Sequence, residues 1–472
     1  MSQRKKNRLE NAKGILRTAE SLLEVIVLTV AYYIVWRNGY EEGVFPPYQF
    51  NGKYVLMGVY ALLVLVLFSN TDGFQFGNLR MMELTLAQCI GLFIINFVTY
   101  FQLCLIANHM VTPVPLLILM AVDLVLCVVF IYGFTWIYHR LYAPHNMLMI
   151  YGSRGSVALK LKMDKRRDKY RVTHLMSVEE GFDKICQEVV KYDAVILTDL
   201  PAQTRNDILK FCYRNRVRTY VTPKISDIMM RGAASISTFA TPLLLVKGTG
   251  LTYAQRFVKR AMDIVLCSLA MIVAAPIMLI VAIAIKIEDG GPVFYKQKRL
   301  TLGGREFEIL KFRSMVTDAE KYGAMMATTH DPRITKVGRV IRPTRIDELP
   351  QILNILKGDM SIVGPRPERT EHVVKYSETL PEFDFRLKVR GGLTGYAQIY
   401  GKYNTSAYDK LRLDMLYIEN YSILMDIRLI LMTLRIMLQK ESTEGFEKVE
   451  ENERLLQETL DKLDQERKEN NG

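Results

Sequence analysis

The sequence predicts a membrane protein of mixed α+β structure: a four-helix transmembrane bundle, a Rossmann-like α/β domain and a mostly helical domain with a re-entrant membrane helix. Three observations predict this order. Half of the 472 residues are hydrophobic although the formal net charge is +13, a pairing typical of membrane proteins with basic cytoplasmic faces. Long apolar runs fill the first third, and short β-branched runs alternate with helical patterns after them. A last long apolar run, 261–286, carries a proline near its middle.

The first 140 residues are predicted to be a basic cytoplasmic N-terminus, 1–18, followed by four transmembrane helices over 19–140. A helix needs about 20 residues to cross a bilayer. Basic residues before the first span and Arg140 after the last place both ends in the cytoplasm. No small-residue cleavage site follows the basic start, so a signal peptide is not favoured. The expected spans are Ala19–Trp36, Tyr54–Phe68, Leu84–Ile106 and Leu116–Tyr138.

Asp123 lies inside the fourth expected span. An acid in a membrane helix is a functional candidate, because its charge is costly to bury in hydrocarbon. We favour a hydrogen bond within the bundle instead, since the sequence offers no evident relay partner in the spans.

Residues 145–250 are predicted to form the α/β domain, because short apolar runs alternate there with helical stretches. Residues 152–155, Gly-Ser-Arg-Gly, follow the first run and form half of a dinucleotide fingerprint. The third glycine is missing and no ribose-binding acid follows at the right distance, so a spacer or self-association module is favoured over a nucleotide site. The expected strands are Met147–Tyr151, Val172–His174, Ala194–Thr198 and Val217–Val221.

The apolar run at 261–286 is predicted to be a re-entrant helix hairpin that dips into one leaflet of the membrane. Basic residues flank it on both sides, and a straight span would place one basic cluster outside, against the positive-inside bias. Pro276 lacks a backbone N–H, and its ring breaks or kinks a helix, so the turn is expected at Ala275–Pro276. The alternative is a kinked fifth span, which would put the rest of the chain on the other side.

A dense set of polar blocks lies between residues 311 and 367. Asp347 and Glu348 are adjacent carboxylates among many Arg and Lys residues. Magnesium binds one or two carboxylates together with substrate phosphates, and arginine matches two phosphate oxygens at once. The segment therefore indicates a site for phosphates and a divalent cation rather than a solvated loop. The blocks are 311–315, 331–335, 342–351, 358–361 and 364–367.

Residues 253–440 resemble the catalytic domain of the bacterial polyprenyl-phosphate sugar-1-phosphate transferases, the long, monotopic type of phosphoglycosyl transferase. Gly391 stands where that family has proline and Tyr396 where it has tryptophan, departures that leave the chemistry intact and the donor sugar open. Beyond this domain, 441–472 is expected to be a charged, exposed helical tail, with too few heptads to establish a coiled coil. The resemblance is carried by Arg260, Asp263, Pro276, Asp347, Glu348, Asp426 and the segments 291–297, 311–313, 364–367, 392–398 and 413–417.

The resemblance implies roles for named residues. Asp347 is the expected nucleophile, and Glu348 is expected to hold magnesium (Mg2+). Asp359 stays open between a second metal ligand and a helix cap, a common position for aspartate. The residues implied to bind phosphates and the donor are Arg342, Arg366, Lys311 and Arg313.

The implied reaction transfers sugar-1-phosphate from a UDP-sugar to undecaprenyl phosphate, releases UMP and passes through an aspartyl-phosphosugar intermediate. It would initiate a bacterial surface polysaccharide, such as a capsule or an exopolysaccharide. The expected location is the bacterial inner membrane, with the active site on the cytoplasmic face and in contact with membrane lipid. A homodimer is a further expectation, because the α/β domain has no evident ligand. Neither the donor sugar nor the polysaccharide can be read from the sequence.

Three other functions stay open. A membrane nucleotide-sugar dehydratase would need a Tyr-x-x-x-Lys pair on a helix, and the only such spacing, Tyr220 to Lys224, contains Pro223. A non-catalytic lipid- or sugar-binding scaffold would turn over nothing, and an ordinary glycosyltransferase would release UDP. Nucleic-acid binding is not expected, because no recognition motif accompanies the positive charge. The six cysteines lack the paired spacing of a disulfide framework or a zinc site.

Overall fold

The computed structural model describes residues 3–41, 52–237, 240–317, 331–401 and 405–437 and the single residues 454, 458 and 461. The chain forms two compact units. One holds the residues up to His145 together with 167–169, and the other holds 146–166 and the chain from Tyr170 onward. Apart from the three single positions, the predicted tail at 441–472 lies outside the described residues.

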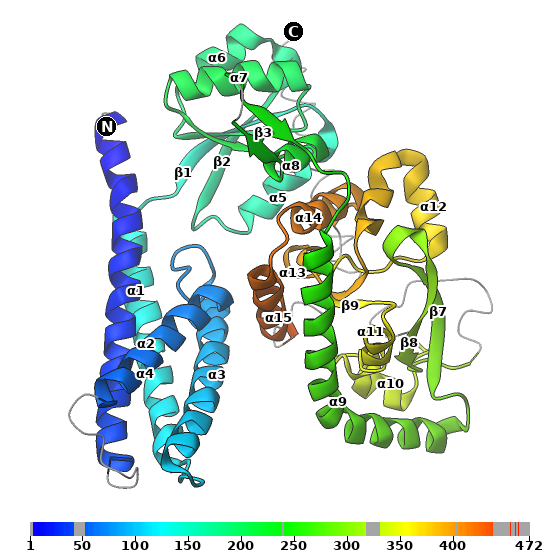
Figure 1. Ribbon diagram of the computed structural model, residues 1–472. Coiled ribbons are helices and arrows are strands. Elements are labelled where there is room, and N and C mark those ends of the chain that lie inside the picture. Colours follow the sequence, from blue (N-terminus) through cyan, green and yellow to red (C-terminus); the bar gives the residue numbers. More distant parts are fainter. Residues whose placement is uncertain are drawn as a thin grey trace. The chain divides into compact units, whose positions relative to one another are not determined.

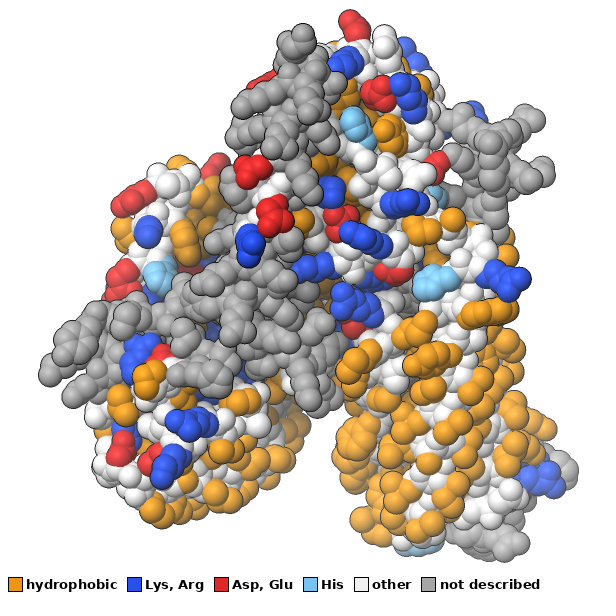
Figure 2. Space-filling model, turned by 180° about the vertical axis from the view of Figure 1, so that it is seen from behind, with side chains coloured by type: hydrophobic (Ala, Val, Ile, Leu, Met, Phe, Trp, Pro, Cys, Tyr) orange, Lys and Arg blue, Asp and Glu red, His pale blue; other side chains and the backbone are white. Residues whose placement is uncertain are grey.

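The first unit is a bundle of four long helices that overlap the four expected spans (Figure 1). Each is long and apolar enough to cross a membrane by length and composition. Figure 2 shows hydrophobic side chains over the outer surface of the bundle. The exposed apolar side chains of these helices include Phe93, Leu105 and Trp136. The helices are α1 (Gln3–Gly39), α2 (Gly52–Thr71), α3 (Met81–Ala107) and α4 (Val114–Leu141).

Polar side chains tie the interior of the bundle together. The Tyr60 hydroxyl donates to Asp123 Oδ2 at 2.8 Å, so the predicted hydrogen bond of Asp123 within the bundle is confirmed. Two further acids of α1, Glu20 and Glu24, are buried in the bundle. Gln88 Nε2 donates to Glu24 Oε1 at 2.8 Å.

The second unit begins with a four-stranded sheet in the order β2-β1-β3-β4, in which the β1/β3 and β3/β4 pairs are parallel (Figure 1). The strands match the four expected ones and are followed by a short antiparallel hairpin, β5/β6. The strands are β1 (His145–Tyr151), β2 (Tyr170–Ser177), β3 (Ala194–Thr198), β4 (Arg218–Val221), β5 (Ala234–Ile236) and β6 (Leu243–Leu245); the helices are α5 (Ala158–Asp164), α6 (Phe182–Val189), α7 (Ala202–Arg214) and α8 (Ile225–Arg231).

Two motifs of this sheet region have structural explanations. A Cβ on Gly152 would lie 2.0 Å from the carbonyl oxygen of Asp199, so the glycine is required by the close approach of two backbone segments. Tyr220 lies on β4 and Lys224 caps the start of α8. They therefore share no helix, and the pair that a dehydratase would need is absent at these positions.

The long apolar run forms one bent helix, α9 (Tyr253–Asp289), with Pro276 inside it. The helix continues through the proline, so the predicted turn at Ala275–Pro276 is a bend within a single helix. Figure 1 shows the sharp bend. The missing N–H of a proline and the clash of its ring with the preceding turn are sufficient to kink a helix.

The N-terminal end of α9 is tied to the domain that follows it. Arg260 donates to the carbonyl oxygens of Ile355 and Leu356 at 2.6 and 2.7 Å. Asp263 Oδ1 accepts from the Ser361 hydroxyl and from the backbone N–H of Ile362. The two polar residues that begin the family motif are thus used to hold the helix in place.

The C-terminal end of α9 is tied to the same domain. Glu288 accepts from the first backbone N–H groups of α10, at 2.6 Å from Lys336, where a helix favours a negative charge. Asp289 pairs with both terminal nitrogens of Arg313. Both ends of this apolar helix therefore rest on one domain.

That domain is mostly helical, as predicted, with a β7/β8 hairpin and a short parallel β9/β10 pair. Its largest apolar core gathers around Phe383, Leu411 and Met415 and includes Ile225 and Ile228 of α8. Its elements are β7 (Phe294–Leu300), β8 (Glu306–Phe312), α10 (Lys336–Ile341), α11 (Gln351–Lys357), β9 (Ser361–Val363), α12 (Thr370–Thr379), β10 (Gly392–Thr394), α13 (Tyr396–Tyr400), α14 (Ala407–Glu419) and α15 (Ile423–Met437).

A buried ion pair joins α9 to α15. Lys259 Nζ lies 2.6 Å from Asp426 Oδ2 and 3.0 Å from the Tyr417 hydroxyl, which itself donates to Asp426 Oδ1. The Lys259 and Asp426 side chains are 8% and 0% exposed. Removal of one member leaves the other charge without compensation in a medium that solvates it poorly.

We expect Lys259→Met to lower the opening free energy of the second unit by about 3–5 kcal/mol. The matched control is Lys296→Met, which removes a pair with Glu308 whose side chains are 60% and 56% exposed, at a cost below about 1 kcal/mol. Hydrogen exchange of peptides from α9 and α15 measures the opening free energy of both variants. Tryptophan fluorescence would not, because Trp36 and Trp136 lie in the bundle. Equal effects of the two substitutions would contradict the assigned role of the buried pair.

Candidate active site

The paired acids Asp347 and Glu348 lie on a single 3-10 turn, 346–348, between α10 and α11. The preceding residue, Arg345, has φ of +57°. This left-handed conformation is uncommon for a residue with a side chain and costs about 1–3 kcal/mol where it persists. The strained residue starts the turn on which both carboxylates sit.

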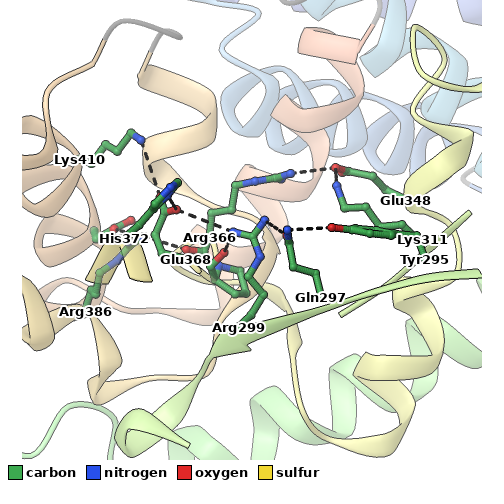
Figure 3. Close-up of polar contacts among 12 residues, drawn as sticks. Tyr295, Gln297, Arg299, Lys311, Glu348, Arg366, Glu368, His372, Arg386 and Lys410 are labelled. Atoms are coloured by element: carbon green, nitrogen blue, oxygen red, sulfur yellow. Dashed lines mark hydrogen bonds and ion pairs between the residues drawn. The ribbon is translucent and has the colours of Figure 1, made fainter. Parts of the chain in front are cut away.

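Glu348 is held by two close cations, and Arg345 lies farther off at 3.9 Å. Its Oε1 lies 2.7 Å from Lys311 Nζ on β8 and 2.8 Å from an Arg366 guanidinium nitrogen (Figure 3). Burial alone would raise the pKa of Glu348, but the charges of Arg366 and Lys311 outweigh it and hold the pKa well below its usual range. Glu348 is therefore a fixed carboxylate at any physiological pH.

Asp347 has the opposite surroundings. Its Oδ1 is buried, and no hydrogen bond reaches that atom from the described residues. Burial raises the pKa of this carboxyl, Lys311 opposes the rise, and the charge of Glu348 adds to it. Asp347 is therefore the less stabilised carboxylate of the pair, with no hydrogen-bond donor on Oδ1.

The loop that carries Arg366 is held in place by hydrogen bonds from other side chains to its backbone carbonyls. Arg386 donates to the Arg366 carbonyl at 2.9 Å and pairs with Asp414 at the same distance. Arg386 and Asp414 are 4% and 1% exposed, and burial raises the pKa of Asp414 to about 6. Arg299 donates to the carbonyl oxygen of Pro367. The loop that carries Arg366 is thus fixed at two successive carbonyls.

A row of polar side chains on β7 continues the site. Arg299 donates to Gln297 at 2.5 Å, and Gln297 donates to the Tyr295 hydroxyl at 3.0 Å (Figure 3). Burial lowers the pKa of Arg299 to about 10. Glu368 lies among Arg299, Arg386, His372 and Lys410.

Sequence reasoning quoted the segment 291–297 but assigned it no role, and it missed Arg299, Arg386 and Glu368. A signal for Arg299 is its place two residues after Gln297, since alternate residues of a strand such as β7 share one face. For Arg386 and Glu368 no local pattern points to the site.

Two other predicted phosphate ligands differ in their contacts: the Arg342 side chain is free to bind a phosphate, and the Arg313 side chain is already paired. The Arg342 side chain makes no hydrogen bond or ion pair with the described residues, and its charge acts on Asp347. Arg313 is 6% exposed, donates to the Pro292 carbonyl and pairs with Asp289. The structure therefore gives Arg313 a structural role, and we remove it from the candidate phosphate ligands.

Asp359 also lies apart from the acid pair. It follows the far end of α11 and pairs with Arg305 at 2.9 Å and with Lys357 at 3.2 Å. It caps no helix N-terminus, because α11 has just ended and β9 follows. Neither of the two predicted roles matches this position, and a residue that holds two cations is a poor candidate for a second metal ligand.

The acid pair fits a magnesium ion only together with substrate. Among the described residues, no group of three His, Cys, Asp or Glu side chains could enclose a metal. The buried, unpartnered Oδ1 of Asp347 and the adjacent Glu348 carboxylate do offer oxygen atoms. Magnesium commonly takes one or two carboxylates and completes its shell with phosphate oxygens and water, so the donor set is adequate for that arrangement.

The comparisons with known proteins cover this same region. A family model described as bacterial sugar transferase matches residues 254–440. The UDP-N-acetylgalactosamine-undecaprenyl-phosphate N-acetylgalactosaminephosphotransferase of Aeromonas hydrophila is 38% identical over 263 residues, which cover 54% of this chain and 61% of that protein.

Two further relatives carry the name UDP-glucose:undecaprenyl-phosphate glucose-1-phosphate transferase. That of Escherichia coli (strain K12) is 38% identical over 41% of this chain and 43% of its own length. That of Caulobacter vibrioides is 41% identical over 39% of this chain and 71% of its own length. The matches thus span less than two thirds of the first two relatives and more than two thirds of the third.

Neutralising substitutions of the two acids should change the stability of the domain in opposite directions. The folded pKa of Asp347 is raised, so its charged form costs stability at neutral pH. We expect Asp347→Asn to raise the opening free energy by about 0.5–2 kcal/mol at pH 7. The gain should shrink as pH falls toward the ordinary aspartate pKa near 3.9. Hydrogen exchange of peptides from α10 and α11 measures the change.

Glu348→Gln is the paired variant. It removes the carboxylate that holds Lys311 and Arg366, and we expect it to lower the opening free energy by about 1.5–3 kcal/mol. The folded pKa of Glu348 is depressed, so this loss should be full above the ordinary glutamate pKa and should fade only at lower pH. If both variants destabilised the protein equally, the assignment of opposite surroundings to Asp347 and Glu348 would be wrong.

Proposed function

The chain belongs to the bacterial sugar transferase family, and from that premise we propose that it transfers a sugar-1-phosphate from a UDP-sugar to undecaprenyl phosphate with release of UMP. The observation that carries the proposal is the contrast within one turn between Asp347, half-buried and without a donor on its buried Oδ1, and Glu348, held by Lys311 and Arg366. A site for two successive phosphoryl transfers needs one free carboxylate and a cationic frame.

In the proposed first step, a carboxylate oxygen of Asp347 attacks the β-phosphorus of the UDP-sugar. The bond between that phosphorus and the bridging oxygen breaks, and UMP leaves with the bridging oxygen. The sugar phosphate remains on Asp347 as an acyl phosphate. Covalent catalysis of this kind replaces one difficult displacement by two easier ones.

In the proposed second step, a phosphate oxygen of undecaprenyl phosphate attacks the same phosphorus. The bond to Asp347 breaks, which restores the carboxylate, and the product is undecaprenyl-diphosphate-sugar. No net proton transfer is required in either step. The main barrier is the approach of two anions, so neutralisation of charge is the central task of the protein.

The cations for this task come from three elements. Arg366 and Lys311 already meet at Glu348, and a donor phosphate could share them at little cost in reorganisation. Arg342, which no described residue pairs, would take up the phosphate charge next to Asp347. Magnesium, bound through Glu348 and substrate oxygens, would further neutralise the phosphates.

The bent helix α9 would place the site at the membrane surface. Its ends contact one domain, which a helix that crossed the bilayer could not achieve, because its ends would lie on opposite sides. We therefore propose that α9 enters one leaflet and returns, as the sequence predicts. A water-soluble donor and a lipid phosphate would then meet at headgroup level.

Location, product and assembly follow as parts of this proposal. The chain would work on the cytoplasmic face of the bacterial inner membrane, where nucleotide-sugars are available, and would begin the synthesis of a surface polysaccharide. The names of the relatives include more than one sugar, so the donor is left to experiment. The predicted homodimer stays a prediction.

Nucleotide release tests the reaction directly. We expect the detergent-solubilised chain, given magnesium and undecaprenyl phosphate, to release UMP from at least one of UDP-glucose, UDP-galactose and their N-acetylated amino-sugar analogues. Asp347→Asn should lower the rate by about three orders of magnitude or more, because the nucleophile is lost. The matched control is Asp384→Asn, which neutralises an exposed carboxylate and should retain activity.

Other outcomes of this assay separate the alternatives. Release of UDP in place of UMP would mean direct glycosyl transfer and would overturn the proposal. UMP release that persisted in Asp347→Asn would refute the covalent step. Silence with every donor, while the lipid still bound, would favour a scaffold.

The position of α9 has its own test. In a cysteine-free background, single cysteines replace Tyr253 at the start of α9, Lys298 on β7 beyond its end, and Met110, an exposed residue between α3 and α4. We expect a membrane-impermeant maleimide to label Met110→Cys in intact spheroplasts and the other two only after permeabilisation. Labelling of Lys298→Cys in intact spheroplasts would show that α9 crosses the membrane as a fifth span.

A further inference from the structure

A second basic pocket lies at the other end of α11 from the acid pair. It has a volume of about 440 Å³ and is lined by residues that include Arg260, Arg305, Lys357, Gly358 and Arg390. α11 holds seven residues, so about 10 Å of helix separates the pocket from the turn with Asp347. None of its cations contacts Glu348.

Three of the four cations in the pocket are held in place by protein groups. Arg260 donates to the two carbonyl oxygens that end α11. Arg305 and Lys357 pair with Asp359, which is 4% exposed. These contacts explain why the cations stay close together in spite of their mutual repulsion.

Arg390 is the exception. It makes no side-chain hydrogen bond and no ion pair with the described residues, although it is half-buried. Burial lowers the pKa of Arg390, the charge of Arg260 lowers it further, and Asp263 acts in the opposite direction. A guanidinium that is partly removed from water and faces other cations is unfavourable unless an anion is supplied from outside.

The charges in and beside the pocket do not cancel. Four cationic side chains line the pocket, and Arg256 acts on it from outside, whereas the carboxylates beside it are Asp263 and Asp359, so positive charge is in excess. Both cation types bind phosphate in proteins, arginine through two parallel hydrogen bonds and lysine as a point charge.

The position along α9 indicates which phosphate is near. Arg260 directly precedes the apolar part of the helix, and the neighbouring Phe257 and Ile264 are 76% and 42% exposed. A helix that changes from basic to apolar at this point matches the boundary between headgroups and acyl chains. The pocket would then open at the depth of lipid phosphates.

We propose that this pocket binds a phosphate group, supplied by the headgroup of an anionic phospholipid of the surrounding leaflet, with Arg390 as its principal ligand. The lipid would fix the N-terminal arm of α9 and the end of α11 relative to the bilayer. It would thereby set the depth of the turn that carries Asp347. The site is independent of the chemistry at Asp347, and its ligand is not consumed.

The test uses the full-length, detergent-solubilised chain and three probes: dihexanoyl phosphatidylglycerol, dihexanoyl phosphatidylcholine and inorganic phosphate. Binding is measured by titration, and native mass spectrometry counts bound lipid. We expect phosphatidylglycerol to bind more tightly than phosphatidylcholine. Arg390→Gln should weaken phosphatidylglycerol binding about tenfold, because one charge-assisted hydrogen-bonded contact is lost.

Two variants make the result specific. Arg390→Lys keeps the charge and should recover part of the affinity, which a folding defect would not allow. Arg231→Gln removes an equal charge from an exposed position on α8 and should leave binding unchanged. Hydrogen exchange of α11 peptides verifies that the Arg390 variants are folded.

Equal phosphatidylglycerol binding by the original chain and Arg390→Gln would overturn the proposal. Arg390-dependent binding of inorganic phosphate without any binding of phosphatidylglycerol would refute the lipid as the source. Because no readout involves turnover, these outcomes are distinct from failure of the UMP assay.

Discussion

The catalytic unit depends on one constraint: a 37-residue, largely apolar helix has both of its ends fastened to the same polar domain. A straight helix of that length would extend about 55 Å and could not return. The bend at Pro276 allows both ends to reach the same domain, and polar side chains near each end form hydrogen bonds and ion pairs with it. Arg260, Asp263, Glu288 and Asp289 are therefore structural residues, although their charges resemble those of a site.

The same domain shows how two adjacent carboxylates acquire different properties. Asp347 and Glu348 share a turn and a similar degree of burial, so desolvation acts on both. Lys311 and Arg366 form ion pairs with Glu348 and lower its pKa; Lys311 only partly offsets the burial of Asp347, whose pKa stays raised. Environments that separate the pKa values of paired acids are how proteins assign them distinct roles. Here the separation is built by β8 and by the loop after β9, far apart in the sequence.

The parts of the structure that were predictable from the sequence are those set by local patterns. The four bundle helices, the four strands of the sheet and the proline bend each follow from apolar periodicity or from one residue type. Asp347, Glu348, Lys311 and Arg366 were recognisable because they stand in short motifs. The partners of Arg313 and Asp359 were not, since Asp289 and Arg305 are distant in sequence and any of the surrounding carboxylates could have paired with any of the cations.

Pairing also divides the many basic residues of this domain into two groups. The first group consists of cations that pair with a carboxylate and are at most 8% exposed, namely Lys259, Arg313 and Arg386. Their ion pairs hold elements of the domain together. Arg342 and Arg390 form no ion pair with the described residues; the charge of Arg342 acts on Asp347, and Arg390 lies among other cations. A protein gains nothing in stability from an unpaired guanidinium at such a place. Its presence is explained if an anion arrives, and the two arginines mark two places, one beside Asp347 and one at the base of α9, where a phosphate would complete the structure.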